Sequence, residues 1–316
     1  MRGLSGAGIA VVAWAGGSVL AKGIDMPAMA IGVYRFALFT MIMVVWLRTR
    51  GTPLTLRALK YSLPGGIALG LDIAFFFSAV KLTNVVNATL IGALQPILVG
   101  VIAARFFGES IKRRDALWSL AALAGVVGVV IASNGTPEWS LKGDLLAFAA
   151  MLCWGAYFIA SKESKKNLTP VEFTTGTAFW TAIINLPLGL AFGQDLSWPN
   201  TRSWMGLLLM TVAAGFIGHT LMNWSLVRIP LWVGSTFTLL IPVASAILAW
   251  VFLDESLSLS QAAAMAVVLF ALAVIVRGQA DDAKTTRASA PSPKSPSPQV
   301  PAPQAPAPES PAPAAG

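Results

Sequence analysis

The sequence predicts an all-α integral membrane protein with ten transmembrane helices, arranged as two inverted five-helix repeats. Composition, ten apolar windows and a repeated segment predict this class. Of the 316 residues, 56% are hydrophobic and only 11% are charged, and the mean hydropathy of +0.71 is far above that of a water-soluble domain. The lipid bilayer is therefore the expected solvent.

The apolar windows are long enough to cross a hydrocarbon core of about 30 Å as helices. They fall at 4–22, 30–47, 62–80, 86–106, 116–133, 144–161, 172–192, 204–226, 232–252 and 259–276. The first window follows Arg2 and resembles a signal peptide, but many more spans follow it. We therefore expect it to be retained as the first helix.

The loops between these windows carry the basic residues that predict orientation. With the N-terminus inside, most of the 22 Lys and Arg residues lie on the cytoplasmic side, and Lys22, Lys81, Lys142 and Arg202 lie outside. The asymmetry predicts a multi-pass protein of the cytoplasmic membrane with both termini in the cytoplasm. It also supports an even number of helices.

The repeat is visible as two related segments. Leu94–Ser110 (LQPILVGVIAARFFGES) returns as Leu240–Ser256 (LIPVASAILAWVFLDES), with Leu, Pro, Ala, Phe, Glu and Ser shared at a fixed offset of 146 residues. Trp14–Lys22 likewise matches Trp154–Lys162. Because five helices are an odd number, the second half must enter the membrane from the opposite side. Inverted repeats of this kind underlie many secondary transporters, whose substrate site lies between the halves.

These matches predict three parts of the chain. Residues 1–134 form the first five-helix repeat and residues 143–277 form the second. Residues 278–316 are expected to be a disordered Pro/Ala-rich cytoplasmic tail, because residues 280–316 hold 10 of the 20 prolines.

The two Trp-to-Lys helices, the two Pro-to-Glu helices and the arginine of Tyr34-Arg35-Phe36-Ala37 together resemble the drug/metabolite transporter superfamily, in particular proteins with two EamA-type domains. The resemblance covers residues 4–277. It implies a ten-helix secondary transporter of the bacterial cytoplasmic membrane that exports small metabolites, amino acids or drugs. One departure is that the second half has Thr174-Thr175-Gly176-Thr177-Ala178 where an equivalent of Arg35 would lie.

Asp72 and Arg35 are ionisable residues inside predicted spans. An ionised carboxylate there is costly unless it is paired, hydrated or protonated, so Asp72 is a candidate to exchange protons or to pair with a base. Arg35 lies at a similar depth. A bond between the two would give both a structural or gating role, which we favour, whereas a free Arg35 could bind a substrate carboxylate or phosphate.

Four further candidates lie in paired helices. His219 and Asn223 share one helix face, and the repeat offset places His219 beside the counterpart of Asp72. His219 is a candidate proton-coupling group or a neutral, hydrogen-bonded side chain. Trp14 and Trp154 occupy matching places and either line a cavity or fill volume.

The repeated segments add polar groups and bends. Pro96 and Pro242 are expected to bend their helices. The neighbouring Gln95, Thr236 and Thr238 can bond a substrate or the opened backbone turn. The recurring Glu109 and Glu255 fall at opposite membrane surfaces, where we expect a scaffold role, and Gly125 and Gly128 are expected to permit close helix packing.

Several function classes are disfavoured. A single cysteine, Cys153, and a single histidine give no metal site and no disulfide within one chain, and we expect no cofactor. The net charge of +8 lies in short loops and signals no nucleic-acid binding. No phosphate-binding GxxxxGK[ST] motif is present, so proton coupling is the simplest driving force for alternating access. The alternatives are a non-transporting scaffold that recruits partners through its proline-rich tail, or an intramembrane enzyme.

Overall fold

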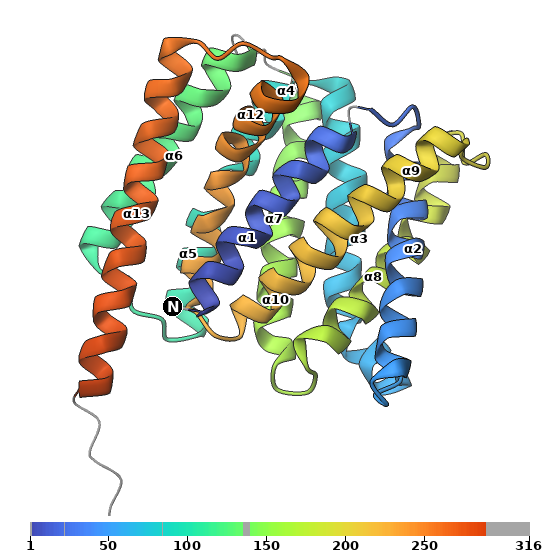
Figure 1. Cartoon of the computed structure of the whole chain (residues 1–316), viewed down its shortest axis with the longest axis horizontal. Coiled ribbons are helices and arrows are strands. Elements are labelled where there is room, and N and C mark those ends of the chain that lie inside the picture. Colours follow the sequence, from blue (N-terminus) through green and yellow to red (C-terminus); the bar gives the residue numbers. More distant parts are fainter. Residues whose placement is uncertain (1, 22, 84, 135–139, 289–316) are drawn as a thin grey trace, which may run out of the picture.

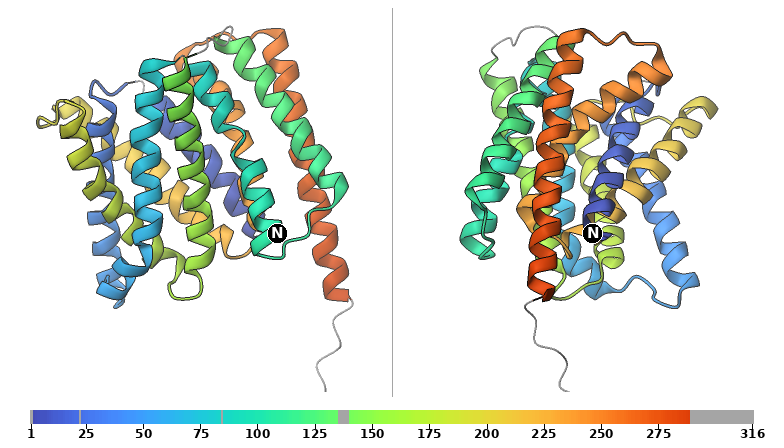
Figure 2. Two further views of the ribbon diagram at one scale, coloured as in Figure 1. Left: turned by 180° about the vertical axis from the view of Figure 1, so that it is seen from behind. Right: turned by 60° about the vertical axis from the view of Figure 1, so that its left-hand side comes forward.

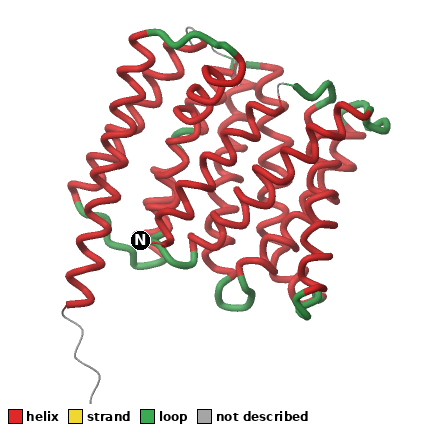
Figure 3. Tube along the Cα trace, in the orientation of Figure 1, coloured by secondary structure: helices red, strands yellow, loops and turns green. Residues whose placement is uncertain are grey.

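The computed structural model describes residues 2–21, 23–83, 85–134 and 140–288, and this part of the chain contains helices and loops but no strand (Figure 3). In chain order the helices are α1 (Arg2–Ala21), α2 (Ala28–Thr49), α3 (Leu56–Leu82), α4 (Val85–Gly92), α5 (Gln95–Phe106), α6 (Arg113–Asn134), α7 (Leu141–Ser164), α8 (Pro170–Ala191), α9 (Thr201–Met210), η1 (Thr211–His219), α10 (Thr220–Leu226), α11 (Leu231–Thr236), η2 (Phe237–Leu239), α12 (Leu240–Leu253) and α13 (Leu259–Ala288).

Each predicted window coincides with a helix or with a run of consecutive helices. Within the described residues, nine helical segments are long and apolar enough to cross a membrane. The remaining window, 172–192, corresponds to α8, which has the length but is less apolar. Its buried residues include Thr174, Thr177, Thr181 and Asn185. The composition of α8 therefore differs from that of the other spans because it carries polar groups into the interior.

Two of the windows are interrupted at their prolines. The chain turns at Ala93 and Leu94 between α4 and α5, and Pro96 lies in the first turn of α5. The second window passes through the 3₁₀ turn η2 before α12, which contains Pro242. Proline fits the first turn of a helix, where its missing N–H is not needed. The irregular segments thus lie where the sequence predicts bends.

The ends of α5 and α12 have the same local structure. Gly108 and Asp254 both adopt left-handed φ angles, of 62° and 54°. In the next residue, the Glu109 backbone N–H donates to Ala103 O at 3.1 Å, and that of Glu255 donates to Ala249 O at 3.4 Å. The paired positions are 146 residues apart, so the sequence repeat is also a repeat of backbone conformation.

The helices pack as a broad bundle with a peripheral pair (Figures 1 and 2). In the bundle α3 packs along α7 and α8, and α1 crosses η1, α10 and α12. α6 and α13 lie side by side at one edge. A Cβ on Gly125 would lie 2.6 Å from Val268 Cγ2, and one on Gly128 would lie 2.9 Å from Ala264 Cβ, so both glycines permit this close contact as expected. The start of α1 and the end of α13 lie at the same end of the bundle.

The predicted start of the disordered tail is wrong. α13 continues to Ala288, so residues 278–288 are helical. The reason is local: no proline occurs before Pro291, and Lys112 Nζ donates a hydrogen bond of 2.5 Å to Asp282 Oδ1 on this extension. The rest of the predicted tail, residues 289–316, lies outside the described residues.

Candidate functional site

Tyr157 is the centre of a buried polar network between α7, α8 and the η1–α10 segment. Its hydroxyl lies 3.1 Å from Nδ1 of His219 and accepts a 2.9 Å hydrogen bond from Nδ2 of Asn223. The Asn223 amide also donates to Thr174 Oγ1 at 2.9 Å. Tyr157, His219 and Asn223 are 0%, 4% and 1% exposed. Since buried polar groups are costly unless bonded, this network holds His219 and Asn223 in defined orientations.

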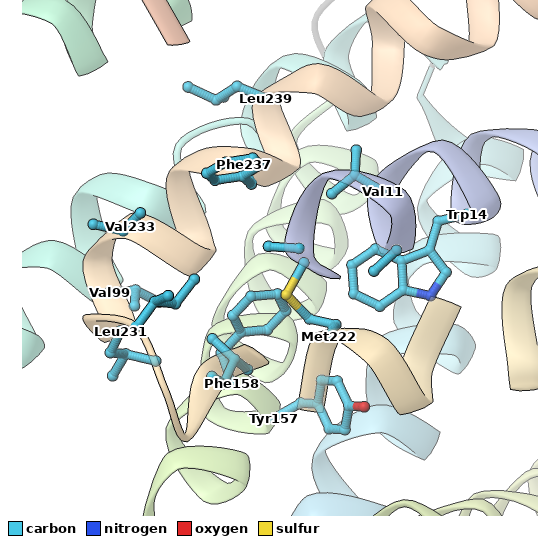
Figure 4. Close-up of a cluster of buried hydrophobic side chains, with 14 of the residues drawn as sticks. Val11, Trp14, Val99, Tyr157, Phe158, Met222, Leu231, Val233, Phe237 and Leu239 are labelled. Carbon is cyan, nitrogen blue, oxygen red and sulfur yellow. The ribbon is translucent and has the colours of Figure 1, made fainter. Parts of the chain in front are cut away.

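Aromatic rings surround the network. The ring centroids of Trp14 and Phe36 lie 5.2 and 5.8 Å from that of His219, and Trp154 stacks on Tyr157 at 5.4 Å. Trp14 also meets Trp154 edge-on at 5.2 Å. Figure 4 shows Tyr157 at the edge of the apolar cluster, with its hydroxyl pointing away from Phe158. The two tryptophans paired in the sequence are therefore in contact, beside His219.

The π-helical segment η1 brings His219 against α1. Small residues allow the approach: a Cβ on Gly17 would lie 2.5 Å from Ala214 Cβ, and one on Gly218 would lie 2.6 Å from Trp14 Cδ1. Wider π turns occur frequently at functional sites. Glycine at 218 thus leaves room for the Trp14 indole directly beside the histidine.

Arg35 on α2 joins this cluster. Its guanidinium lies 4.8 Å from the centre of the Phe36 ring, and that ring lies 5.8 Å from the ring of His219. Within the described part of the chain, its buried Nε has no hydrogen-bond partner. The helix is held in place through its backbone, because Thr211 Oγ1 donates to Arg35 O at 3.4 Å.

The expected pair between Arg35 and Asp72 is not formed among the described residues. The physical reason is packing: α2 lies along α8 and η1, while α3 lies between α7 and α8. The two charged side chains therefore come from helices with different packing partners and do not form an ion pair.

The polar residues of the repeated segments form a second group. Thr238 Oγ1 lies 3.4 Å from Gln95 Oε1, so the two segments meet across a sequence separation of 143 residues. Thr236 Oγ1 donates to Trp232 O within its own helix, at 2.8 Å. Gln95 is fully buried and its Nε2 has no partner in the described part of the chain. These residues thus support the bent segments, and Gln95 also packs against α7, because a Cβ on Gly155 would lie 3.8 Å from Gln95 Cγ.

Glu109 ties the two sequence repeats together at one end of the bundle. Its carboxylate accepts hydrogen bonds from the backbone N–H groups of Leu231, at 2.7 Å, and Trp232, at 3.2 Å. Lys162 Nζ lies 3.4 Å from the same carboxylate and donates to Ile229 O at 2.5 Å. Glu109 therefore joins the end of α5 to the start of α11 and the end of α7.

Sequence reasoning missed Tyr157 and the polar face of α8. Thr177, Thr181 and Asn185 are buried, and each has an oxygen without a partner in the described part of the chain. Asn185 Nδ2 donates to Thr181 O at 2.9 Å. The signals were present: Tyr157 follows Trp154 by three residues on one helix, and these polar residues recur every three or four residues.

A pocket of about 410 Å³ lies beyond the end of α1, at the start of α9. It is lined by Gly23, Ile24, Asp25, Asn200, Arg202 and Ser203. None of the residues predicted as a site from the sequence lines this pocket. It is a polar surface feature distinct from the buried network.

Three known proteins with similar sequences are named as transporters, an efflux pump or an exporter. The chain is 26% identical over 226 residues to the uncharacterized transporter YyaM of Bacillus subtilis (strain 168), covering 69% of this chain and 74% of that protein. It is 26% identical over 283 residues to a probable amino-acid metabolite efflux pump of Salmonella typhimurium, covering 85% and 93%. A shorter match of 156 residues, 28% identical, is to the aromatic amino acid exporter YddG of Ancylobacter novellus, covering 48% and 52%.

A solved crystal structure superposes with a TM-score of 0.77 at 20% identity, covering 88% of this chain and 98% of that one, which supports the fold alone. The profile of the EamA-like transporter family matches residues 1–131 and 141–277, nearly all of the chain before the proline-rich tail. The chain therefore belongs to the EamA-like transporter family.

Proposed function

We propose that this protein is a secondary exporter of small metabolites, in particular amino acids, across the bacterial cytoplasmic membrane. The observation that carries the proposal is the buried network of Tyr157, His219 and Asn223 inside an aromatic shell, where five helical elements meet. The relatives named as exporters of amino acids support the substrate class. Polar groups inside a membrane bundle mark substrate or ion pathways.

We place the site between two inverted five-helix repeats, residues 1–134 and 143–277. The equal ends of α5 and α12 support this arrangement. Two reciprocal contacts between the repeats also support it. A Cβ on Gly3 of the first repeat would lie 2.7 Å from Ile229 Cγ2 of the second, and one on Gly143 of the second would lie 2.6 Å from the backbone N of Thr83 of the first. The two halves then rock about the site and expose it to each side in turn.

We propose that the bonds of Glu109 close the bundle at the end where both described termini lie. Its bonds to the start of α11 and to Lys162 join elements of the two repeats, and they must break if that end opens. The repeat assigns the equivalent place at the opposite end to Glu255. The loop charges support a cytoplasmic location for the end that carries the termini.

Reconstituted vesicles test the function. Vesicles that contain the protein and are loaded with L-threonine or L-phenylalanine should take up the labelled amino acid by exchange, and Asn223→Leu should abolish this uptake. Tyr61→Phe is the control, because Tyr61 is 43% exposed on the surface. Exchange by neither amino acid, nor by other small metabolites, would contradict the proposal.

Proton coupling is the proposed driving force, with Asp72 and His219 as the candidate groups. An imposed pH gradient should drive net transport by the wild-type protein. Asp72→Asn should leave exchange intact and remove the effect of the gradient, and His219→Gln should remove that effect as well. Net transport that ignores the gradient in the wild-type protein would rule out this coupling.

A further inference from the structure

Arg35 carries a positive charge in the interior of a membrane protein without an acidic partner among the described residues. Its guanidinium lies 4.8 Å from the centre of the Phe36 ring, which in turn lies 5.8 Å from the His219 ring. The other buried cation, Lys162, is neutralised by Glu109 at 3.4 Å. Of these two cations, Lys162 has an acidic partner, whereas Arg35 has none among the described residues.

An uncompensated guanidinium in this environment is costly, so its retention calls for a negative partner. The Phe36 ring offers only a weak cation–π attraction. The Arg35 side chain is partly rather than completely buried, while its Nε is fully enclosed and unpartnered within the described residues. The remaining guanidinium nitrogens can therefore be reached by a bound anion.

The surroundings contain a second unused donor. Trp14 Nε1 is buried without a partner in the described part of the chain, and its ring packs against His219. Arg35 and Trp14 both supply only N–H groups, which are satisfied by oxygen acceptors. An oxyanion is thus the chemical group that this region is able to accept.

The positive charge available at Arg35 indicates which kind of oxyanion fits best. One guanidinium matches the single charge of a carboxylate and binds its two oxygens in a fork. A phosphate would bring nearly two charges at neutral pH. His219 is neutral when Tyr157 donates to its Nδ1, so Arg35 is then the one fixed positive charge beside the aromatic shell among the described residues. A carboxylate is therefore the better match.

We propose that Arg35 binds the carboxylate of the exported substrate, so that the substrates are small monocarboxylates, α-amino acids included. This assignment rests on the proposed export function. The apolar part of such a substrate packs against the aromatic shell formed by Trp14, Phe36, Trp154 and Tyr157. The resemblance of the two halves does not extend to this site, because the second half has no equivalent of Arg35.

The first test compares two probes on the wild-type protein and needs no variant. L-Phenylalanine should compete with exchange at least about tenfold more strongly than L-phenylalaninamide, which lacks the negative charge. Equal competition by the acid and the amide would overturn the carboxylate assignment. Failure to exchange any probe, charged or neutral, would instead overturn the export function itself.

The second test uses variants of the arginine. Arg35→Gln should weaken binding of L-phenylalanine about tenfold or more and leave the weak binding of the amide unchanged, and Arg35→Lys should restore part of the difference. Arg48→Gln, on the exposed end of the same helix, is the matched control and should bind as the wild-type protein does. An equal loss for acid and amide in Arg35→Gln would mean that Arg35 only supports the fold.

Discussion

The hydroxyl of Tyr157 links side chains from three helical segments. It contacts His219 and Asn223, and Asn223 continues the network to Thr174 on α8. A neutral histidine with its proton on Nε2 can accept the hydroxyl hydrogen at Nδ1. The same hydroxyl lies 3.2 Å from Asn223 Oδ1, so its one hydrogen is donated either to that amide oxygen or to His219, and the tautomer of His219 follows from which acceptor it takes.

Tyr157→Phe tests this residue. Removing the hydroxyl leaves buried groups of His219 and Asn223 without a partner, which should lower stability by about 1–3 kcal/mol. The loss is measured as a lower thermal unfolding temperature in detergent, and amino-acid exchange should fall as well. Tyr61→Phe removes an exposed hydroxyl and should change neither quantity. Unchanged stability of Tyr157→Phe would show that the network contributes little.

The approach of α1 to η1 depends on residues without large side chains. Gly17 faces Ala214, and Gly218 faces the Trp14 indole. η1 ends at His219, so the histidine directly follows the glycine that faces the indole. An element that packs this closely cannot admit an added methyl group without moving its neighbour.

Gly218→Ala tests that contact. The new Cβ would lie 2.6 Å from Trp14 Cδ1, so the indole must shift, at a cost of about 1–3 kcal/mol. The expected result is a lower unfolding temperature and weaker amino-acid exchange. Gly16→Ala on α1 is the control, because its nearest neighbour would be 3.9 Å away. Equal behaviour of the two variants would contradict the role of Gly218.

In the proposed alternating-access mechanism, the whole molecule opens at one end while it stays closed at the other. The Glu109 carboxylate joins α5, α7 and α11 at the end where the described termini lie. Cys153, the only cysteine in the chain, lies partly buried near the middle of α7. The rate at which its thiol reacts with an added reagent therefore measures access to the interior.

Glu109→Gln should favour the state that is open at this end. Glutamine keeps one acceptor for the start of α11 but loses the attraction to Lys162, so a membrane-impermeant maleimide added from that side should label Cys153 several-fold faster. Glu163→Gln changes an exposed pair with Lys166 near the same end and serves as the control. Labelling that stays at the wild-type rate would argue against Glu109 as a closure.

Composition and apolar length by themselves determined the helical membrane fold, because a bilayer allows few other ways to satisfy the backbone. The offset between the two proline-containing segments predicted the matching ends of α5 and α12. Trp14, Trp154, His219 and Asn223 were identified from their positions in paired helices, and the structure brings them together. The apolar periodicity therefore predicted the helical fold, and the internal repeat identified several residues of the candidate site.

Only the tertiary structure decided which charged groups meet. It separates Arg35 from Asp72, pairs Glu109 with Lys162, and places Tyr157 at the centre of the polar network. The physical reason is that similar depth in the membrane does not imply contact: partners are selected by which helices pack together and by how each is rotated about its axis. That rotation is fixed by close contacts such as Gly218 against Trp14, between residues far apart in the sequence.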